Sequence, residues 1–291
     1  MATATELTES GTSKTIQVGE DRIHYHEAGE GQAVIFCHAY GPGTTAWINY
    51  CKNIGPLSKH FRCLLLDSNA TGKTSVAPLP DETGHETVAR TVLMLMDALG
   101  IEKADVVGDS MGGTSVLVFG YKYPDRVRKI VTGSCHHSTL QSSREGGEPY
   151  MIANRPSEGN RVTAKVSADP SKENFREYLK VHLDQESLVT DELVAYVHNA
   201  YHESLANRPP GSRRGSSGPH SNLHDLWDVR APTLIVYGRY DRMCSYEIGL
   251  TILNYVADSR IIVLNDCGHW PPYERPEEYN TYVEAFLKLP I

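Results

Sequence analysis

The residues around one serine of this sequence, Ser110, are of the types expected around a nucleophile. It is the centre of the pentapeptide Gly108-Asp109-Ser110-Met111-Gly112, at the end of the apolar run ADVVG and directly before a helical pattern. A G-x-S-x-G sequence between a buried strand and a helix forms a sharp turn. Its glycines let backbone segments approach without a Cβ, and the serine hydroxyl is lifted clear of the sheet. Ser110 is therefore predicted to be a nucleophile.

A serine hydroxyl needs a base, and the base needs a third group to hold it. Asp241 follows the strand-like run TLIVYG, and His269 follows the run RIIVL. Both therefore lie just past a strand's carboxyl end, as Ser110 does. We predict that His269 takes the proton from Ser110, while Asp241 fixes the imidazole tautomer. Asp266 is an alternative acid, but it precedes His269 in the same loop and would orient the imidazole poorly.

An acyl-transfer site also needs N–H donors for the developing oxyanion. The segment HAYGPG (38–43) follows the strand-like run AVIFC. We predict one donor at Tyr40, with Gly41 as the alternative, and a second at Met111, the residue after the nucleophile. His136, just past the run KIVTG, is a further candidate for shaping the pocket.

The order of apolar runs predicts the sheet that must position these residues. After an expected hairpin over 15–26, short runs typical of buried strands occur at 33–37, 63–66, 104–108, 129–133, 233–238 and 260–264. Helical patterns between them predict an α/β fold with a doubly wound, mostly parallel sheet. Two amphipathic helical patterns, near 171–183 and 190–205, interrupt this alternation after the sixth strand. We therefore predict a core of residues 1–135 and 226–291, with a helical lid of residues 136–225 over the carboxyl ends of the strands.

Composition and charge argue against several other classes of protein. Against 28 Lys and Arg, 36 Asp and Glu give a net charge of −8, which disfavours nucleic-acid binding. No apolar run approaches the ~20 residues that cross a bilayer, and the first residues lack the features of a secretory signal. Six widely spaced cysteines without a CxxC pair predict buried free thiols. We expect a cytoplasmic protein that acts on a small molecule, without a nucleic-acid or membrane partner.

Neither a metal nor a cofactor is expected. His24 and His26 lie on one face of a predicted strand, but they lack the carboxylate or cysteine neighbours of a zinc site. We expect them to be surface or pocket residues.

These residues and motifs resemble the α/β-hydrolase superfamily, and within it most of all the meta-cleavage product hydrolases. Members of that subgroup split carbon–carbon bonds in ring-fission products of aromatic degradation. The segments that carry the resemblance are 41–57, 106–127, 183–193 and 267–280. The resemblance implies that Ser110, Asp241 and His269 are a catalytic triad. It also implies that Asn49 is a polar pocket residue and that Trp270 is the tryptophan after the catalytic histidine, and it suggests a homodimer.

The chain departs from that subgroup at positions that would contact substrate. Asp109 stands where the subgroup has asparagine, and Val197 stands where it has an arginine that grips the substrate carboxylate. Burying a substrate carboxylate without a cationic partner costs free energy, and the Asp109 carboxylate would repel it. We therefore predict that the triad cleaves an ester or lactone of a small, hydrophobic substrate through an acyl-enzyme.

The residues predicted to contact that substrate are Gly41, Asn49, Asp109, His136, Val197 and Trp270. Two other functions are kept as alternatives. The first is carbon–carbon bond hydrolysis as in the resembled subgroup. The second is a non-catalytic small-ligand receptor on the same fold.

Overall fold

A single mixed sheet runs through the protein. The computed structural model describes residues 7–69, 72–135, 158–206 and 223–290. In this part of the chain the strand order is β1-β2-β4-β3-β5-β6-β7-β8. The strands are β1 Ser13–Val18, β2 Asp21–Ala28, β3 Ala33–Cys37, β4 Arg62–Leu66, β5 Ala104–Asp109, β6 Val127–Gly133, β7 Thr233–Gly238 and β8 Ser259–Leu264. β2 pairs antiparallel with β1 and β4, and all other pairs are parallel. The predicted α/β fold with a mostly parallel sheet is confirmed.

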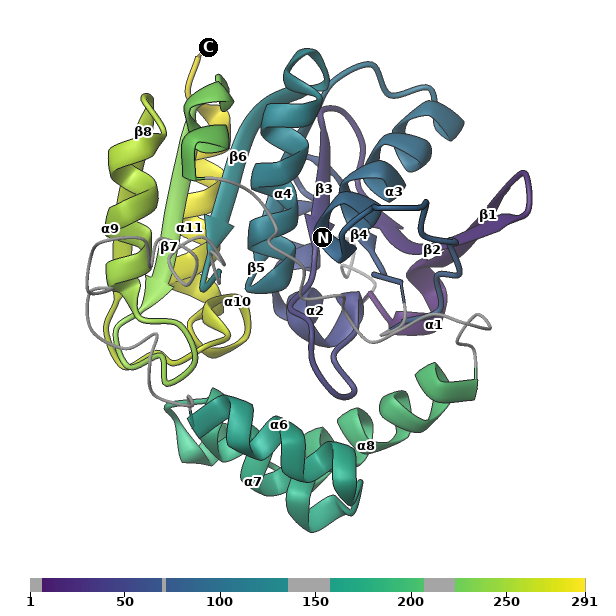
Figure 1. The fold of residues 1–291 in the computed structure, drawn as a ribbon, viewed down its shortest axis with the longest axis vertical. Helices are drawn as coiled ribbons and strands as arrows, with labels where there is room; N and C mark the ends of the chain where they lie inside the picture. The colour runs from purple at the N-terminus through teal and green to yellow at the C-terminus, as the bar shows by residue number, and fades with distance from the viewer. Residues whose placement is uncertain (1–6, 70–71, 136–157, 207–222, 291) are drawn as a thin grey trace, which may run out of the picture.

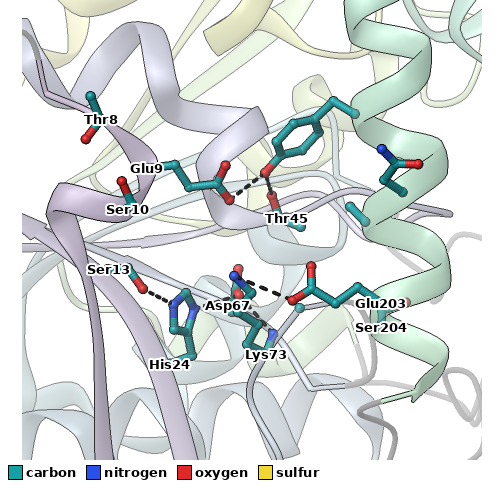
Figure 2. Close-up of a pocket in the computed structure, with 14 residues that line it drawn as sticks. Thr8, Glu9, Ser10, Ser13, His24, Thr45, Asp67, Lys73, Glu203 and Ser204 are labelled. Carbon is teal, nitrogen blue, oxygen red and sulfur yellow. Dashed lines mark hydrogen bonds and ion pairs between the residues drawn. The ribbon is translucent and has the colours of Figure 1, made fainter.

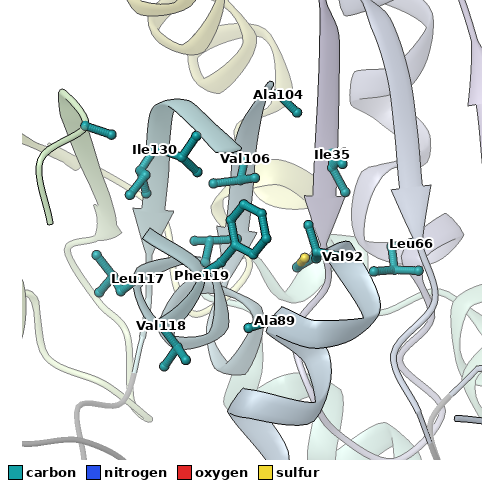
Figure 3. Packing of buried hydrophobic residues seen from close by; sticks show 14 of the residues in the cluster. Ile35, Leu66, Ala89, Val92, Ala104, Val106, Leu117, Val118, Phe119 and Ile130 are labelled. Carbon is teal, nitrogen blue, oxygen red and sulfur yellow. The ribbon is translucent and has the colours of Figure 1, made fainter. Parts of the chain in front are cut away.

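Alternating apolar side chains bury both faces of the sheet. In β3, Ile35 belongs to one apolar cluster, whereas Val34 and Phe36 belong to the cluster on the opposite face. Helices α3 Gly84–Ala98, α4 Met111–Lys122 and α9 Tyr246–Tyr255 cover the first face, where Val92 and Phe119 pack on the strands (Figure 3). Helices α2 Ala46–Leu57 and α11 Pro276–Lys288 cover the second face. Full burial of one large apolar side chain stabilises the folded state by about 1.5–3 kcal/mol. The many such side chains on the two faces hold the sheet, and with it the ends of its strands, in place.

Among the described residues, three α-helices lie between β6 and β7 in the sequence and beyond the carboxyl ends of the strands in space (Figure 1). They are α6 Glu158–Ala168, α7 Lys172–His182 and α8 Asp191–Ala206, which we call the lid helices. Apolar residues of these helices form one buried cluster with Ala39, Ile48 and Trp270 of the core. Helices α7 and α8 correspond to the two predicted helical patterns, and α6 was not predicted. The boundary at 136 and the segment 207–222 lie outside the described residues, so the predicted lid limits stay predictions.

Two expectations from composition can be compared with the structure. All six cysteines lie in described residues and are free thiols, and all except Cys51 are buried. Within the described ranges, no helix is both long enough and apolar enough to cross a membrane.

Candidate active site

Ser110 occupies the turn between β5 and α4 in a strained backbone conformation. Its φ of 54° and ψ of −119° lie outside the regions that residues other than glycine normally adopt. The turn is tight. A Cβ on Gly108 would lie 2.3 Å from the Gly112 carbonyl oxygen, and one on Gly112 would lie 2.0 Å from the Cys37 carbonyl oxygen. The predicted glycine-dependent turn is therefore present.

The imidazole of His269 connects Ser110 to Asp241. Ser110 Oγ lies 2.9 Å from His269 Nε2, and Asp241 Oδ2 lies 2.8 Å from His269 Nδ1. The His269 and Asp241 side chains are 3% and 0% exposed. We call Ser110, His269 and Asp241 the relay. Asp266, the alternative acid, is exposed on the surface, and the acid bonded to His269 is Asp241.

The Asp241 carboxylate is fixed by its own loop. Its Oδ1 accepts hydrogen bonds from the backbone N–H groups of Met243 (2.7 Å) and Cys244 (2.9 Å), which leaves Oδ2 for His269. Burial by itself lowers the pKa of His269, but the charge and hydrogen bond of Asp241 outweigh it and raise that pKa above its ordinary value. An imidazole held this way is stabilised in the protonated form that follows proton transfer from Ser110.

Asn49, a predicted pocket residue, joins two parts of the site. Its Nδ2 donates to Asp109 Oδ2 at 3.2 Å, and its Oδ1 accepts from the Ala39 N–H at 2.7 Å. Burial raises the pKa of Asp109 to about 7. The Ala39 N–H is already bonded to Asn49, so it is not available as an oxyanion donor.

The two segments predicted to supply oxyanion donors lie next to each other. Met111 begins α4, and the first N–H groups of a helix have no partner within it. The contact of Gly112 with the Cys37 carbonyl places this helix start against the end of β3, where the loop of Tyr40 begins. The choice between Tyr40 and Gly41 stays a prediction.

Two of the predicted pocket residues, Val197 and Trp270, lie in the apolar cluster that the lid helices form with the core. Val197 of α8 is fully buried, and Trp270 is 1% exposed in the same apolar cluster. A Cβ on Gly43 would lie 1.9 Å from the Val197 carbonyl oxygen, so α8 packs directly on the loop after β3. His136 lies outside the described residues.

Two buried polar residues beside the relay were not predicted, His182 and Glu274. The His182 ring centroid lies 5.4 Å from that of His269, and the His182 carbonyl accepts the His269 N–H at 2.7 Å. Its Nδ1 bonds the Tyr178 carbonyl at 2.8 Å, and burial lowers its pKa to about 3, so the ring is neutral. No local pattern marks His182, whereas Glu274 lies in segment 267–280, which carries the family resemblance.

A polar cavity of about 710 Å³ lies apart from the relay (Figure 2). Its walls come from α1 (Glu9–Thr12), the starts of β1 and α2, β2, the loop after β4, and α8. They include Ser13, His24, Thr45, Asp67, Lys73 and Glu203. None of the three relay residues is among its lining residues.

Comparisons with known proteins agree with this geometry. A family model described as the alpha/beta hydrolase fold matches residues 32–276. The chain is 36% identical to a 2-hydroxy-6-oxo-6-phenylhexa-2,4-dienoate hydrolase of Comamonas testosteroni, over 98% of this chain and 99% of the relative. It is 35% identical to a 2-hydroxy-6-oxononadienedioate/2-hydroxy-6-oxononatrienedioate hydrolase of the same organism, over 97% and 98%.

A solved structure extends the comparison to the fold. The meta-cleavage product hydrolase CumD of Pseudomonas fluorescens IP01, in a mutant form complexed with acetates, has a TM-score of 0.78 and 28% identity. The match covers 94% of this chain and 97% of the other. The chain thus belongs to the α/β-hydrolase fold family, and within that family it is similar to the meta-cleavage product hydrolases.

Proposed function

We propose that this protein hydrolyses a carbon–carbon bond in a 2-hydroxy-6-oxo-dienoate. The observation that supports this most is end-to-end similarity, at 36% and 35% identity, to two hydrolases named for such dienoates. The relay, with its 2.9 and 2.8 Å hydrogen bonds, supplies the groups that the chemistry needs. The relatives therefore favour the alternative prediction over the ester or lactone hydrolase.

The proposed reaction begins at the 6-oxo carbon. Ser110 Oγ attacks this carbon while His269 Nε2 takes the hydroxyl proton, and the carbonyl electron pair moves to oxygen. The N–H groups of Met111 and Tyr40 stabilise that oxyanion. The form attacked is the 2-oxo tautomer, in which the 2-hydroxyl proton has moved to C5. When the adduct collapses, the C5–C6 bond breaks, its electron pair is delocalised through C4 and C3 onto the 2-oxo oxygen, and that oxygen takes the proton from His269. Water deprotonated by His269 then cleaves the acyl-enzyme and restores Ser110.

Ester or lactone hydrolysis is the second candidate, and the apolar wall of the site favours it. Val197, where the family resemblance places an arginine, is fully buried in a cluster with Tyr178 and Trp270. A wall of this kind stabilises an uncharged substrate and offers no countercharge to a carboxylate.

The two candidates are separated by comparing kcat/KM on 2-hydroxy-6-oxo-6-phenylhexa-2,4-dienoate, a p-nitrophenyl ester and an aryl lactone. We expect the dienoate to exceed the others by more than about a hundredfold, or ~2.7 kcal/mol of transition-state stabilisation. A preference of the same size for the ester or lactone would overturn the proposal in favour of the second candidate. Ser110→Ala is the control, and turnover that survives it would assign the activity to another residue.

A substitution at Val197 sharpens the same comparison. Val197→Arg would place a cation at the position where the resembled subgroup has one, so KM for the dienoate should fall relative to KM for the ester. The variant's thermal unfolding must be measured beside it, because inserting a larger side chain into a packed cluster costs about 1–3 kcal/mol. An equal change in both KM values would show that position 197 does not face the substrate.

A further inference from the structure

Glu274 is a buried carboxyl group beside the relay that the proposed reaction does not use. It ends α10 (Pro271–Glu274) and is 5% exposed. Its Oε1 accepts backbone N–H bonds from Gly268 at 3.0 Å and Trp270 at 3.2 Å. These two residues flank His269, so a single carboxylate oxygen holds the backbone on both sides of the proposed base.

The other oxygen of Glu274 reaches the lid. Oε2 accepts the backbone N–H of Asp184 at 2.7 Å, and Asp184 lies two residues beyond the end of α7. In the same place the His182 carbonyl accepts the His269 N–H at 2.7 Å. A Cβ on Gly268 would lie 2.6 Å from the His182 carbonyl oxygen and 2.8 Å from Asp184 N. The loop of His269 is therefore fastened directly to the end of lid helix α7.

The end of α7 also contacts the loop of the acid. Arg242, next to Asp241, donates from Nη1 to the Lys180 carbonyl at 3.1 Å. Both loops that carry the base and the acid thus rest on the same few residues of the lid. The bonds of Glu274 and of Arg242 are made by side chains, and those of Glu274 hold the backbone on both sides of His269, so a substitution of Glu274 tests this connection directly.

Glutamine cannot replace the carboxylate in this arrangement. Two acceptor oxygens serve three N–H donors, and an amide has one acceptor oxygen and one NH₂ group. In either orientation its NH₂ group faces an N–H, either that of Asp184 or those of Gly268 and Trp270. The substitution also removes the negative charge of Glu274, which helps to raise the pKa of His269.

We propose that Glu274 is a positioning residue that fixes His269 for proton transfer and ties its position to lid helix α7. The inference rests on His269 being the base of the proposed function. It predicts that the catalytic geometry of the core depends on where the end of α7 lies.

The test compares Glu274→Gln with Glu277→Gln, the same change at an exposed residue three positions along the chain. Two quantities are measured: the rate at which a fluorophosphonate labels Ser110, and the titration of His269 followed by NMR. Glu274→Gln should slow labelling by about tenfold to a hundredfold, because ~1 Å of misplacement has effects of this order. It should also move the His269 titration to lower pH, whereas Glu277→Gln should leave both within about twofold of wild type.

Gly268→Ala separates position from charge. Its added methyl group would press on the His182 carbonyl and should slow labelling, while the Glu274 charge is kept and the His269 titration moves less than in Glu274→Gln. Labelling of Glu274→Gln within twofold of wild type, or an equal effect of Glu277→Gln, would overturn the inference.

The same experiments give different results if the proposed function, and not the role of Glu274, is wrong. If Ser110 is labelled but the dienoate is not turned over, the proposed substrate is wrong, and the proposed role of Glu274 is unaffected. If the wild-type protein is not labelled at all, Ser110 is not the nucleophile. In that case, a His269 titration that is the same in Glu274→Gln as in wild type would refute the positioning role as well.

Discussion

Two Ser–His–Asp hydrogen-bond chains of nearly the same dimensions lie in the described part of this protein. Besides the relay, Ser13 Oγ lies 2.8 Å from His24 Nε2, and His24 Nδ1 lies 2.8 Å from Asp67 Oδ2. We call Ser13, His24 and Asp67 the second triplet. It lines the polar cavity of Figure 2, and its histidine and aspartate are as deeply buried as those of the relay. Hydrogen-bond geometry alone therefore does not distinguish a candidate catalytic site from a structural one.

The backbone around each serine does distinguish them. Ser13 has an extended conformation, with φ −66° and ψ 127°, and its N–H donates to the Glu9 carbonyl. Ser110 has a φ of 54° and stands at the start of a 12-residue helix, where N–H groups lack partners within the helix. The N–H groups of both serines are bonded, that of Ser110 to the Gly133 carbonyl at 2.8 Å. The difference is that a developing oxyanion beside Ser110 lies at the start of a helix, whereas Ser13 begins strand β1.

The charges around the second triplet also oppose catalysis. The cavity wall carries the Glu9 carboxylate, which would repel an oxyanion, and its Lys73 ammonium lies 3.7 Å from the Glu203 carboxylate that neutralises it. Asp67 accepts backbone N–H bonds from Ala46 and Lys73, both at 2.9 Å. Burial alone would raise the pKa of Asp67, but the His24 hydrogen bond and nearby histidines hold it far below its usual range. We infer that the second triplet stabilises the fold by connecting β1, β2, α2 and the loop after β4.

The largest expected difference between the two regions is in turnover. Ser110→Ala should lower kcat by at least about 10⁴-fold, because it removes the nucleophile. Ser13→Ala should keep kcat within about twofold of wild type. Steady-state kinetics on the best substrate of the wild type would check this, and comparable losses in both variants would mean that the second triplet is catalytic.

The two aspartates should separate activity from stability. Asp241→Asn should lower kcat by about 10³–10⁴-fold, because His269 would lose the carboxylate that sets its tautomer. Asp67→Asn should leave kcat nearly unchanged but lower the free energy of unfolding by about 2–4 kcal/mol, because it removes a buried carboxylate that accepts hydrogen bonds from His24 and from the backbone N–H groups of Ala46 and Lys73. Urea unfolding and kcat measured on the same samples give both quantities. Loss of turnover in folded Asp67→Asn would contradict the structural role.

The pH dependence should involve the relay and not the second triplet. His269 acts as a base when neutral, and its pKa is raised, so kcat/KM should fall about tenfold per pH unit below a pKa that lies above ~6.5. Asp109→Asn should move this acid limb to lower pH, since the Asp109 charge helps to raise the pKa of His269. His24→Gln should leave the limb where it is, and a shift there would show that the two regions are coupled.

The smallest expected effect is on stability in acid. A carboxyl group whose pKa is lower in the folded state stabilises the fold above its unfolded pKa of ~3.9 and loses that contribution as pH falls through the folded value. The difference in unfolding free energy between wild type and Asp67→Asn should therefore decrease progressively below about pH 4. Unfolding free energies of both proteins between pH 3 and 7 would test this. A constant difference would mean that the Asp67 charge contributes nothing.

The sequence predicted the sheet well because apolar runs report directly on burial. Helix α2 was predicted only as part of the alternation of strands and helices, without bounds, and Gly55 and Pro56 lie in its last turns. Helix α6 was missed because few of its residues are apolar, and its contacts with the core come through Val162 and Val166. These helices depend on tertiary packing that periodicity does not report.

The relay was predictable because parallel strands bring their carboxyl ends to one edge of the sheet. The contacts of His182 and Glu274 were not, because they depend on how the lid sits on the core. The second triplet was missed for a related reason. It requires the register of β1 on β2, in which Thr15 pairs with His24, and the approach of β4 to β2. The expectation that His24 is a surface or pocket residue agrees with its place in the cavity wall.

The most direct test of the account is peptide mapping by mass spectrometry after reaction with a fluorophosphonate. We predict one covalent adduct per chain, on the peptide that contains Ser110, and none in Ser110→Ala. An adduct on Ser13, or labelling that persists in Ser110→Ala, would contradict the assignment of the relay as the catalytic site.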